Sequence, residues 1–300
     1  MATMDTSSQQ ELLALPRTGT RSLRSRLRNL SGRGGMYILL LLILLIQFFP
    51  MLWALLTSFM TPAQTTSIPA TLFPTTPTLS SYITALQGDI GRYYVNSIIA
   101  SLSATIITMI LGTLAAYAFA RLRFRFKTPL LIFVLSLSLF PPLAQVIPLY
   151  QILQMLHLVG TLGALILPYS VLGLPLAILI MIGFFQDVPI EFEEAAVVDG
   201  MSRLGALLRI IVPITIPGLF ATAIIVFVGN WNEYLFALNY TTTNTYTLPV
   251  GIVTISQTEF TTNFGVLSAA TVMSVVPLVI LILLLERRIV SGLMAGGLKG

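Results

Sequence analysis

The sequence predicts an all-α integral membrane protein with six transmembrane helices, and three observations support this prediction. First, 56% of the 300 residues are hydrophobic and only 9% are charged, and the mean hydropathy is +0.91. Second, several runs without Asp, Glu, Lys or Arg reach the roughly 20 residues that a helix needs to cross a bilayer. Third, the basic residues are confined to alternate connections between these runs. Helices are expected because a helix pairs its own backbone groups in lipid.

The charge-free runs divide the chain into spans and connections. The expected spans are residues 36–59, 95–120, 129–150, 162–185, 210–229 and 264–285. The third contains Pro141, Pro142 and Pro148, so we expect it to be interrupted and to line a wet cavity, where the freed backbone groups can be satisfied. The first is too long for the apolar core of a signal peptide and is expected to be an uncleaved anchor.

Lysine and arginine indicate the orientation in the membrane. All basic residues except Arg92 lie before the first span, between the second and third, after the fourth or after the sixth. They are Arg17, Arg21, Arg24, Arg26, Arg28, Arg33, Arg121, Arg123, Arg125, Lys127, Arg203, Arg209, Arg287, Arg288 and Lys299. Because positively charged connections stay in the cytoplasm, both termini and the connection 186–209 are expected inside. Residues 61–81 and 239–263 are expected to face outward.

This pattern predicts three regions along the chain. A basic cytoplasmic segment covers 1–35, a transmembrane domain covers 36–286, and a cytoplasmic tail covers 287–300. The arginines of the first segment are expected to hold it against anionic membrane lipid. The net charge of +5 is therefore explained by topology, and no nucleic-acid partner is expected.

The inventory of reactive side chains is small. The chain has no Cys and a single His, His157, so no catalytic site and no metal site are expected. A G-x4-G-K-[ST] phosphate loop is absent from the sequence, so ATP and Mg²⁺ are not expected to bind to this chain. The expected spans lack the ionisable relays of ion-coupled carriers. A self-sufficient channel or secondary carrier is the alternative, and an intramembrane enzyme would need a catalytic dyad that the spans do not show.

The connection 186–209 contains an acidic segment that predicts a short helix. Asp187 is expected to cap this helix and Pro189 to occupy its first turn. Negative charge near a helix N-terminus is favourable because of the helix dipole, and the acids here are Glu191, Glu193 and Glu194. Ala195 and Ala196 would leave one face shallow enough for another surface to approach closely.

A second short helix is expected after Gly200. This glycine predicts a turn with a positive φ, and Ser202 can cap the helix that follows. Apolar residues at helical spacing would give a partner a surface to bind; they are Met201, Leu204 and Leu208, with Arg203 and Arg209 beside them. The same composition could also belong to a solvated connector between two spans.

The spacing in this loop resembles a pattern of a known family. Membrane subunits of bacterial ABC importers carry a cytoplasmic loop with the pattern E-A-A-x3-G-x9-I-x-L-P. The matching positions are Glu194, Ala195, Ala196, Gly200, Ile210, Val212 (in place of Leu) and Pro213; Asp199 and Pro217 also resemble the family. The stretches NWNEYLFAL and RRIVSGLMAGGLKG are similar to the smaller permease subunit of carbohydrate importers of the maltose and trehalose type. Residues 1–33 do not resemble the family's shared region.

The resemblance implies a type I ABC importer permease fold in the bacterial inner membrane. In such importers, two non-identical permease subunits form the path, two copies of an ABC ATPase bind ATP and Mg²⁺, and an extracytoplasmic solute-binding protein delivers the sugar. The resemblance implies that this chain is not an enzyme and that its second loop helix is the coupling helix that docks on the ATPase. The implied ATPase-coupling residues are Glu194, Ala195, Ala196, Asp199, Gly200, Met201, Ser202, Arg203 and Leu204.

Candidate sugar contacts lie near the outer end of the fifth span. Sugars bind to planar polar groups beside aromatic rings. The stretch NWNEY offers such groups in Asn230, Trp231, Asn232, Glu233 and Tyr234, and Gln145 of the third span is a similar candidate. The alternative is that these aromatic residues are interfacial anchors. Trehalose, maltose-like oligosaccharides and glucosylated osmolytes are all compatible with the sequence.

Overall fold

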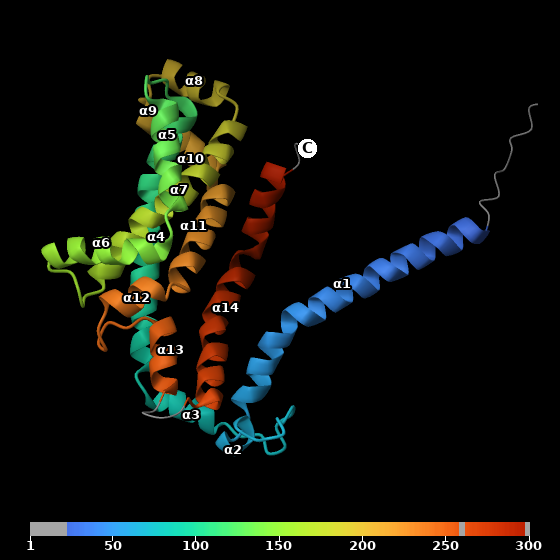
Figure 1. Cartoon of the computed structure of the whole chain (residues 1–300). Coiled ribbons are helices and arrows are strands. Elements are labelled where there is room, and N and C mark those ends of the chain that lie inside the picture. The colour runs from blue at the N-terminus through green and yellow to red at the C-terminus, as the bar shows by residue number, and fades with distance from the viewer. Residues whose placement is uncertain (1–22, 258–261, 298–300) are drawn as a thin grey trace, which may run out of the picture. The chain divides into compact units, whose positions relative to one another are not determined.

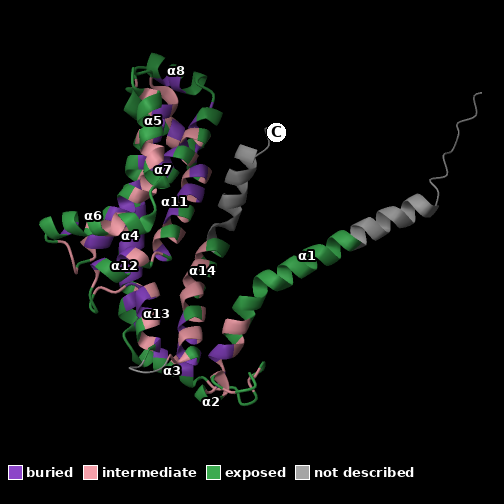
Figure 2. Ribbon diagram, in the orientation of Figure 1, coloured by how far each residue is buried: buried purple, intermediate pink, exposed green. Residues whose placement is uncertain are grey.

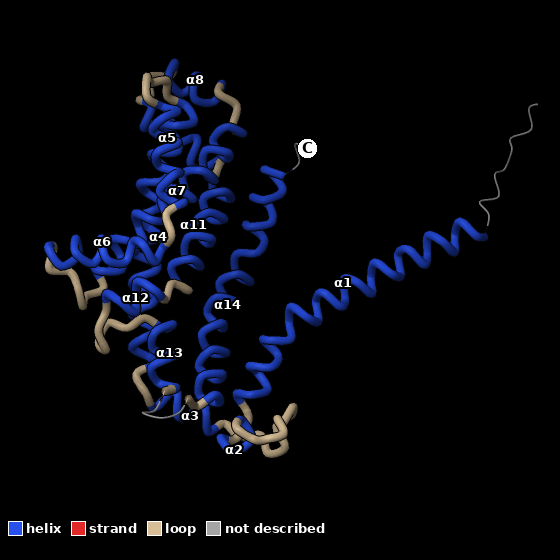
Figure 3. The backbone as a smooth tube through the Cα atoms, in the orientation of Figure 1, coloured by secondary structure: helices blue, strands red, loops and turns tan. Residues whose placement is uncertain are grey.

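The computed structural model describes residues 23–257 and 262–297, and side chains over 35–257 and 262–283. The described residues form helices joined by loops (Figure 3). The chain forms two compact units, Met1–Trp53 and Ala54–Gly300. Part of the topology prediction lies outside the described side chains: Arg17, Arg21, Arg24, Arg26, Arg28, Arg33, Arg287, Arg288 and Lys299.

The first unit contains most of α1 (Leu23–Ser58). The part of α1 that is apolar and long enough to cross a membrane is Gly35–Ser58, which agrees with the first expected span. Every residue from Gly35 to Leu52 is exposed within the chain, as Figure 2 shows. Such an apolar surface is stable in lipid because a helix satisfies its backbone groups internally.

The second unit is built around α4 (Ile90–Arg121) and α7 (Gly163–Asp187), which pack together, with α11 (Ile216–Trp231) and α14 (Phe264–Gly297) beside them (Figure 1). Small residues allow the close approach of α4 and α7. A Cβ on Gly112 would lie 3.1 Å from the Ala177 Cβ. Thr108 Oγ1 donates a hydrogen bond of 2.9 Å to the Ser170 carbonyl. Small residues and interhelical hydrogen bonds are the usual means of helix association in lipid.

The six expected spans are found as four continuous helices and two bent pairs within residues 23–257 and 262–297. The continuous helices are Gly35–Ser58, Ile90–Arg121, Gly163–Asp187 and Phe264–Leu283. The second expected span begins at Ile90 rather than at residue 95. The all-α membrane fold is therefore confirmed, and the two corrections below concern the third and fifth spans.

The third expected span is broken into two helices that meet at 102°. Helices α5 (Lys127–Ser136) and η2 (Leu137–Leu139) precede the break, and α6 (Pro142–Met155) follows it. Pro141 and Pro142 have no backbone N–H and cannot continue the helical pairing. Gln145 Nε2 instead donates to the Phe140 carbonyl at 2.9 Å. The predicted interruption is confirmed. The Gln145 side chain satisfies one of the backbone carbonyls that the interruption leaves without a helical partner.

The prediction of one unbroken span over 210–229 was wrong. The segment Arg203–Ile214 meets α11 at 82°, with Thr215 at the bend. Pro217 lies in the first turn of α11, where its missing N–H is tolerated but the helix cannot extend smoothly backward. Residues 210–214 therefore belong with the preceding loop, in η3 (Leu207–Ile211) and α10 (Val212–Ile214).

The stretch 239–263, which is expected to face outward, is more than a connecting loop. It contains the end of α12 (Leu235–Tyr240) and all of α13 (Leu248–Ser256), while residues 258–261 lie outside the described residues. Leu248 and Val250 of α13 are buried. Gly251 lies so close to the ring of Tyr93 that a Cβ would overlap it. Helix α13 is therefore part of the core.

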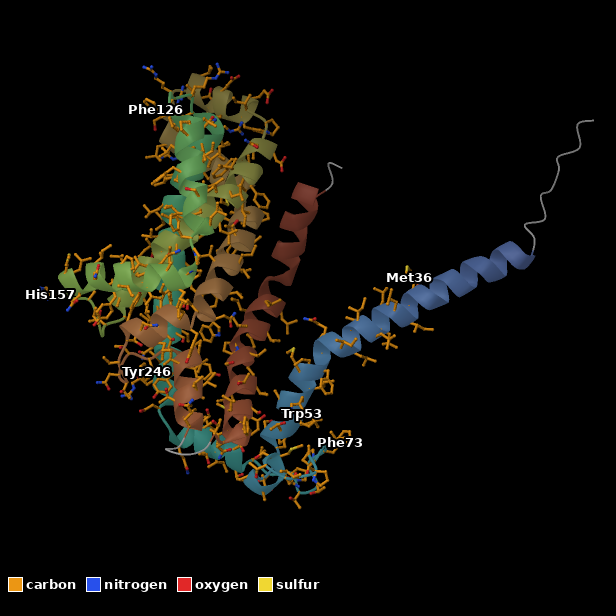
Figure 4. The ribbon with its side chains drawn as sticks, in the orientation of Figure 1. Met36, Trp53, Phe73, Phe126, His157 and Tyr246 are labelled. Carbon is orange, nitrogen blue, oxygen red and sulfur yellow. The ribbon has the colours of Figure 1, made fainter. Side chains whose placement is uncertain are left out.

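The ends of the second unit carry different segments (Figure 1). Helices α8 (Glu191–Val198) and α9 (Arg203–Ala206) lie at one end, and α2 (Pro62–Thr65), α3 (Ser80–Gln87) and α13 lie at the other. Figure 4 shows Phe126 at the α8 end and Phe73 at the opposite end. The connection between α4 and α5 and the loop that contains α8 and α9, which are both expected inside, thus lie at the same end of this unit.

Candidate functional site

Helix α8 forms the first half of the candidate coupling loop. It spans Glu191–Val198, with Glu191, Glu193 and Glu194 in its first turn, as predicted. Its N-cap residue is Ile190, so the prediction that Asp187 caps it was wrong. Asp187 is the last residue of α7, because α7 continues two residues beyond the expected end of its span.

The turn between the two loop helices is fixed by Gly200, whose φ is +87°. The Met201 N–H donates to the Ala196 carbonyl at 2.9 Å, and the Gly200 N–H donates to the Val197 carbonyl at 3.0 Å. These two bonds form a Schellman motif, which commonly requires glycine at this position. A Cβ on Gly200 would meet no atom within 4 Å, so the requirement comes from the backbone angle and not from lack of space.

The second loop helix begins as predicted at Ser202. The Ser202 Oγ accepts a hydrogen bond from the Gly205 N–H at 3.1 Å and caps α9. This α-helix is a single turn and continues as a π-helical turn over Leu207–Ile211. Leu204 is 54% exposed and Leu208 57% exposed, while Leu207 and Ile211 are buried. The expected apolar stripe therefore faces away from the core.

The two alanines of the E-A-A pattern differ in exposure. Ala195 is exposed and Ala196 is buried, and the close approach of a partner to this face stays a prediction. Both line a hollow of about 370 Å³ beside α8, together with Glu191, Phe192, Asp199 and Ile210. Glu194 and Asp199 are exposed, so their carboxylates are available to a partner.

Glu193, unlike the exposed Glu194, faces the interior of the chain. It is 8% exposed and accepts a hydrogen bond of 2.6 Å from the Tyr117 hydroxyl. Its other carboxylate oxygen lies 3.7 Å from Arg121 Nε. Sequence reasoning missed this cluster. The available signal was a tyrosine and an arginine four residues apart at the end of a span, which places them on one face of α4.

Glu233, one of the expected sugar contacts, is occupied within the chain. Its carboxylate accepts bonds from the Tyr169 hydroxyl at 2.6 Å, from the Phe236 N–H at 2.8 Å and from the Ala237 N–H at 3.1 Å. It therefore satisfies the first N–H groups of α12 and ties this helix to α7. This arrangement gives Glu233 a structural role.

Trp231 is also part of the core. It is 3% exposed, and its ring lies 6.3 Å from that of Tyr94 and 5.8 Å from that of Phe227. A ring that is buried to this extent within the chain has almost no surface left for a ligand or for the membrane interface. Burial of a large aromatic ring between α4 and α11 instead stabilises their packing.

The other candidate sugar-contact residues have side chains that are at least partly accessible. Asn232 and Tyr234 are exposed, and Asn230 and Gln145 are half-buried. Asn230 Nδ2 donates to Thr105 Oγ1 at 3.3 Å, across to α4. The structure thus brings Asn230 to Tyr234 together around the junction of α11 and α12, but separates Trp231 and Glu233 from the rest by burial and internal bonding.

Comparisons with known proteins agree with this architecture. Residues 108–294, more than half of the chain, match the family described as "Binding-protein-dependent transport system inner membrane component". The chain is 40% identical to the sulfoquinovosyl glycerol transport system permease protein of Agrobacterium fabrum, over 90% of this chain and 95% of that protein. It is 38% identical to the trehalose/maltose transport system permease protein of Thermococcus litoralis, over 87% and 94%.

A solved structure also has this fold. One chain of a bacterial ABC transporter involved in the import of the acidic polysaccharide alginate aligns with a TM-score of 0.72, covering 89% of this chain and 98% of that chain at 21% identity. This likeness shows the fold, and the family match and the two relatives show the function class. The chain therefore belongs to the inner-membrane permease components of binding-protein-dependent ABC transport systems.

Proposed function

We propose that this permease carries a carbohydrate inward and that its loop 186–209 couples it to a separate ATPase. The observation that carries the coupling proposal is the geometry of the loop: Glu194 and Leu204 are both exposed on either side of the rigid turn at Gly200. A carboxylate beside an apolar side chain suits a partner cleft that offers a basic residue and an apolar floor. The carbohydrate class is supported by the relatives, which are named for transport of sulfoquinovosyl glycerol and of trehalose or maltose.

In this proposal the α8 end of the second unit is cytoplasmic. Arg121, Arg123, Arg125 and Lys127 lie at the end of α4 and the start of α5, and Figure 1 shows these helix ends beside α8. Basic residues are retained on the cytoplasmic side. ATP and Mg²⁺ bind to the partner ATPase and not to this chain, and an extracytoplasmic solute-binding protein approaches the opposite end.

A second, non-identical permease completes the path in this proposal. Helix α4 presents a row of exposed apolar side chains, which are Ile98, Ile99, Leu102, Ile106 and Ile110. Such a surface is compatible with lipid and with a second membrane subunit. Two copies of the ATPase would then bind one loop from each permease.

Reconstitution tests the proposal. The chain is purified with its co-purifying subunits and placed in liposomes with the solute-binding protein, and uptake of labelled trehalose, maltose and a glucosylated polyol is measured with and without ATP. We expect uptake of at least one of these sugars that requires ATP and the solute-binding protein. ATP-independent sugar flux in liposomes that contain only this chain would show a self-sufficient carrier and contradict the proposal.

A further inference from the structure

The buried cluster of Tyr117, Glu193 and Arg121, which we call the loop anchor, has a structural position that the proposed function does not use. It joins the end of α4 to three points of the loop. Arg121 Nη2 donates to the Val188 carbonyl just before α8. Tyr117 donates to Glu193 within α8 at 2.6 Å. The same hydroxyl lies 3.4 Å from the Arg203 carbonyl at the start of α9.

A carboxylate is an unusual choice for the buried position of Glu193. Removing a carboxylate from water is costly unless it is paired and hydrogen-bonded. The favourable interaction with the helix dipole is already available to Glu191 and Glu194, which are both exposed. An apolar residue at 193 would extend the adjacent cluster of Phe185, Leu207 and their neighbours. Directional bonds, unlike apolar contacts, fix an orientation.

Helix α4 provides a firm base for these bonds. It continues for 32 residues without an internal proline, whereas α7 contains Pro168 and Pro175. Its other end is bound to the connection between α12 and α13: Asn96 Nδ2 donates to the Asn244 and Tyr246 carbonyls at 3.0 and 2.9 Å. Figure 4 shows Tyr246 at this connection. One continuous helix therefore holds both the loop and a segment toward the opposite end.

We propose that the loop anchor is a positioning site that fixes the coupling loop on α4. It sets the direction in which Glu194 and Leu204 are presented to the ATPase and makes the loop and α4 move as one body. The consequence for transport rests on the proposed function. The fixing of the loop on α4 is a property of this chain alone and can be measured without any partner.

The first test measures the position of the loop directly. The chain has no native cysteine, so spin labels can be placed at Arg123→Cys and Val198→Cys, which are exposed sites after α4 and at the end of α8. The full chain is studied in lipid nanodiscs by pulsed electron resonance. We expect one narrow distance distribution, and a broad one when Tyr117→Phe or Glu193→Leu is added. Combining both changes should broaden it by less than the sum of the two separate effects, because both changes remove the bond between Tyr117 and Glu193.

Matched controls come from the opposite end of the unit. Tyr82→Phe removes a hydroxyl that lies 2.8 Å from Ser58 Oγ, and Asp89→Asn removes the charge that pairs with Arg92 at 2.6 Å. Both should leave the distribution narrow. Tyr117→Phe keeps the ring that packs edge-on against Phe185, so the fold is retained. A broad distribution in the unmodified chain, or an unchanged one in both anchor variants, would overturn the inference.

The second test measures coupling in the assembled importer. The number of ATP molecules hydrolysed per sugar imported should rise at least about tenfold in Tyr117→Phe and Glu193→Leu. Loss of a hydrogen bond to a charged group lowers the ratio of correctly to wrongly oriented loops by about that factor. Glu193→Gln keeps an acceptor for the Tyr117 hydroxyl, so its ratio of ATP hydrolysed to sugar imported should lie between those of Glu193→Leu and the unmodified complex. A merely structural change would lower both rates together and leave their ratio unchanged. If the unmodified complex imports no sugar, the proposed function fails, while the distance measurement still decides the inference.

Discussion

At the scale of single residues, Gly200 is the position where a backbone angle determines the turn between the two loop helices. Its φ of +87° strains a β-branched residue by about 1–3 kcal/mol. Gly200→Val should therefore reopen the turn, re-aim α9 and reduce both transport and ATPase stimulation strongly. Gly200→Asn should retain most activity, because Asn tolerates the left-handed region. Gly183→Val is the control, since Gly183 also faces open space but has no positive φ. Equal transport by Gly200→Val and the unmodified chain would contradict the role of the turn.

A substitution at Glu194 can distinguish an effect on ATPase docking from an effect on folding. Its side chain is exposed, so Glu194→Ala should leave thermal unfolding in detergent unchanged. Loss of a charge-assisted contact with the ATPase should weaken its binding by about 1.5–3 kcal/mol, measured as the dissociation constant of the permease–ATPase complex. Glu194→Gln should show an intermediate loss. Unfolding at a lower temperature for Glu194→Ala would contradict the exposed, partner-facing position.

Local chemistry made some of these residues predictable and left others hidden. Gly200 and Ser202 act through backbone atoms within five positions along the chain, so their roles follow from the sequence around them. Glu193 and Glu194 are adjacent acids of the same helix, and only the packing of α8 on α4 distinguishes the buried one from the exposed one. The burial of Trp231 and the internal hydrogen bonds of Glu233 were hidden for the same reason, because their partners Tyr94 and Tyr169 are distant in sequence.

At the scale of elements, α13 depends on a close contact between Gly251 and Tyr93. A Cβ on Gly251 would overlap the ring, and overpacking of this kind costs about 1–3 kcal/mol. Gly251→Ala should lower the unfolding temperature, and adding Tyr93→Leu should restore part of the loss. Gly229→Ala, where a Cβ would meet no atom within 4 Å, should have no comparable effect. Unchanged unfolding for Gly251→Ala would show that α13 is not docked on α4.

Hydrophobic runs predicted the helices better than they predicted the bends. The break in the third span was expected because two adjacent prolines, Pro141 and Pro142, interrupt it. The 82° bend at Thr215 was not expected. The residues before and after Pro217 are apolar, so the hydrophobic run continues through the bend without a visible break. Helix α13 escaped prediction because its nine residues are too few to span a bilayer, and its burial depends on α4.

At the scale of the whole chain, the distribution of basic residues predicts on which side of the membrane each end of the second unit lies. Phe126 and Phe73 lie at opposite ends of this unit (Figure 4) and are 66% and 68% exposed. They are therefore a matched pair for single cysteines in a chain that has none. Because connections rich in Arg and Lys remain in the cytoplasm, the side chain at position 126 is expected inside and that at position 73 outside.

The measurement is labelling of spheroplasts with a membrane-impermeant thiol reagent. Phe73→Cys should react in intact spheroplasts, whereas Phe126→Cys and Val198→Cys should react only after the membrane is disrupted. Val198 is 86% exposed, so protection of a cysteine there would come from the membrane and not from burial in the chain. Reaction of Val198→Cys in intact spheroplasts would place the loop outside, where no ATP is available to a coupled ATPase, and would contradict both the orientation and the coupling proposal.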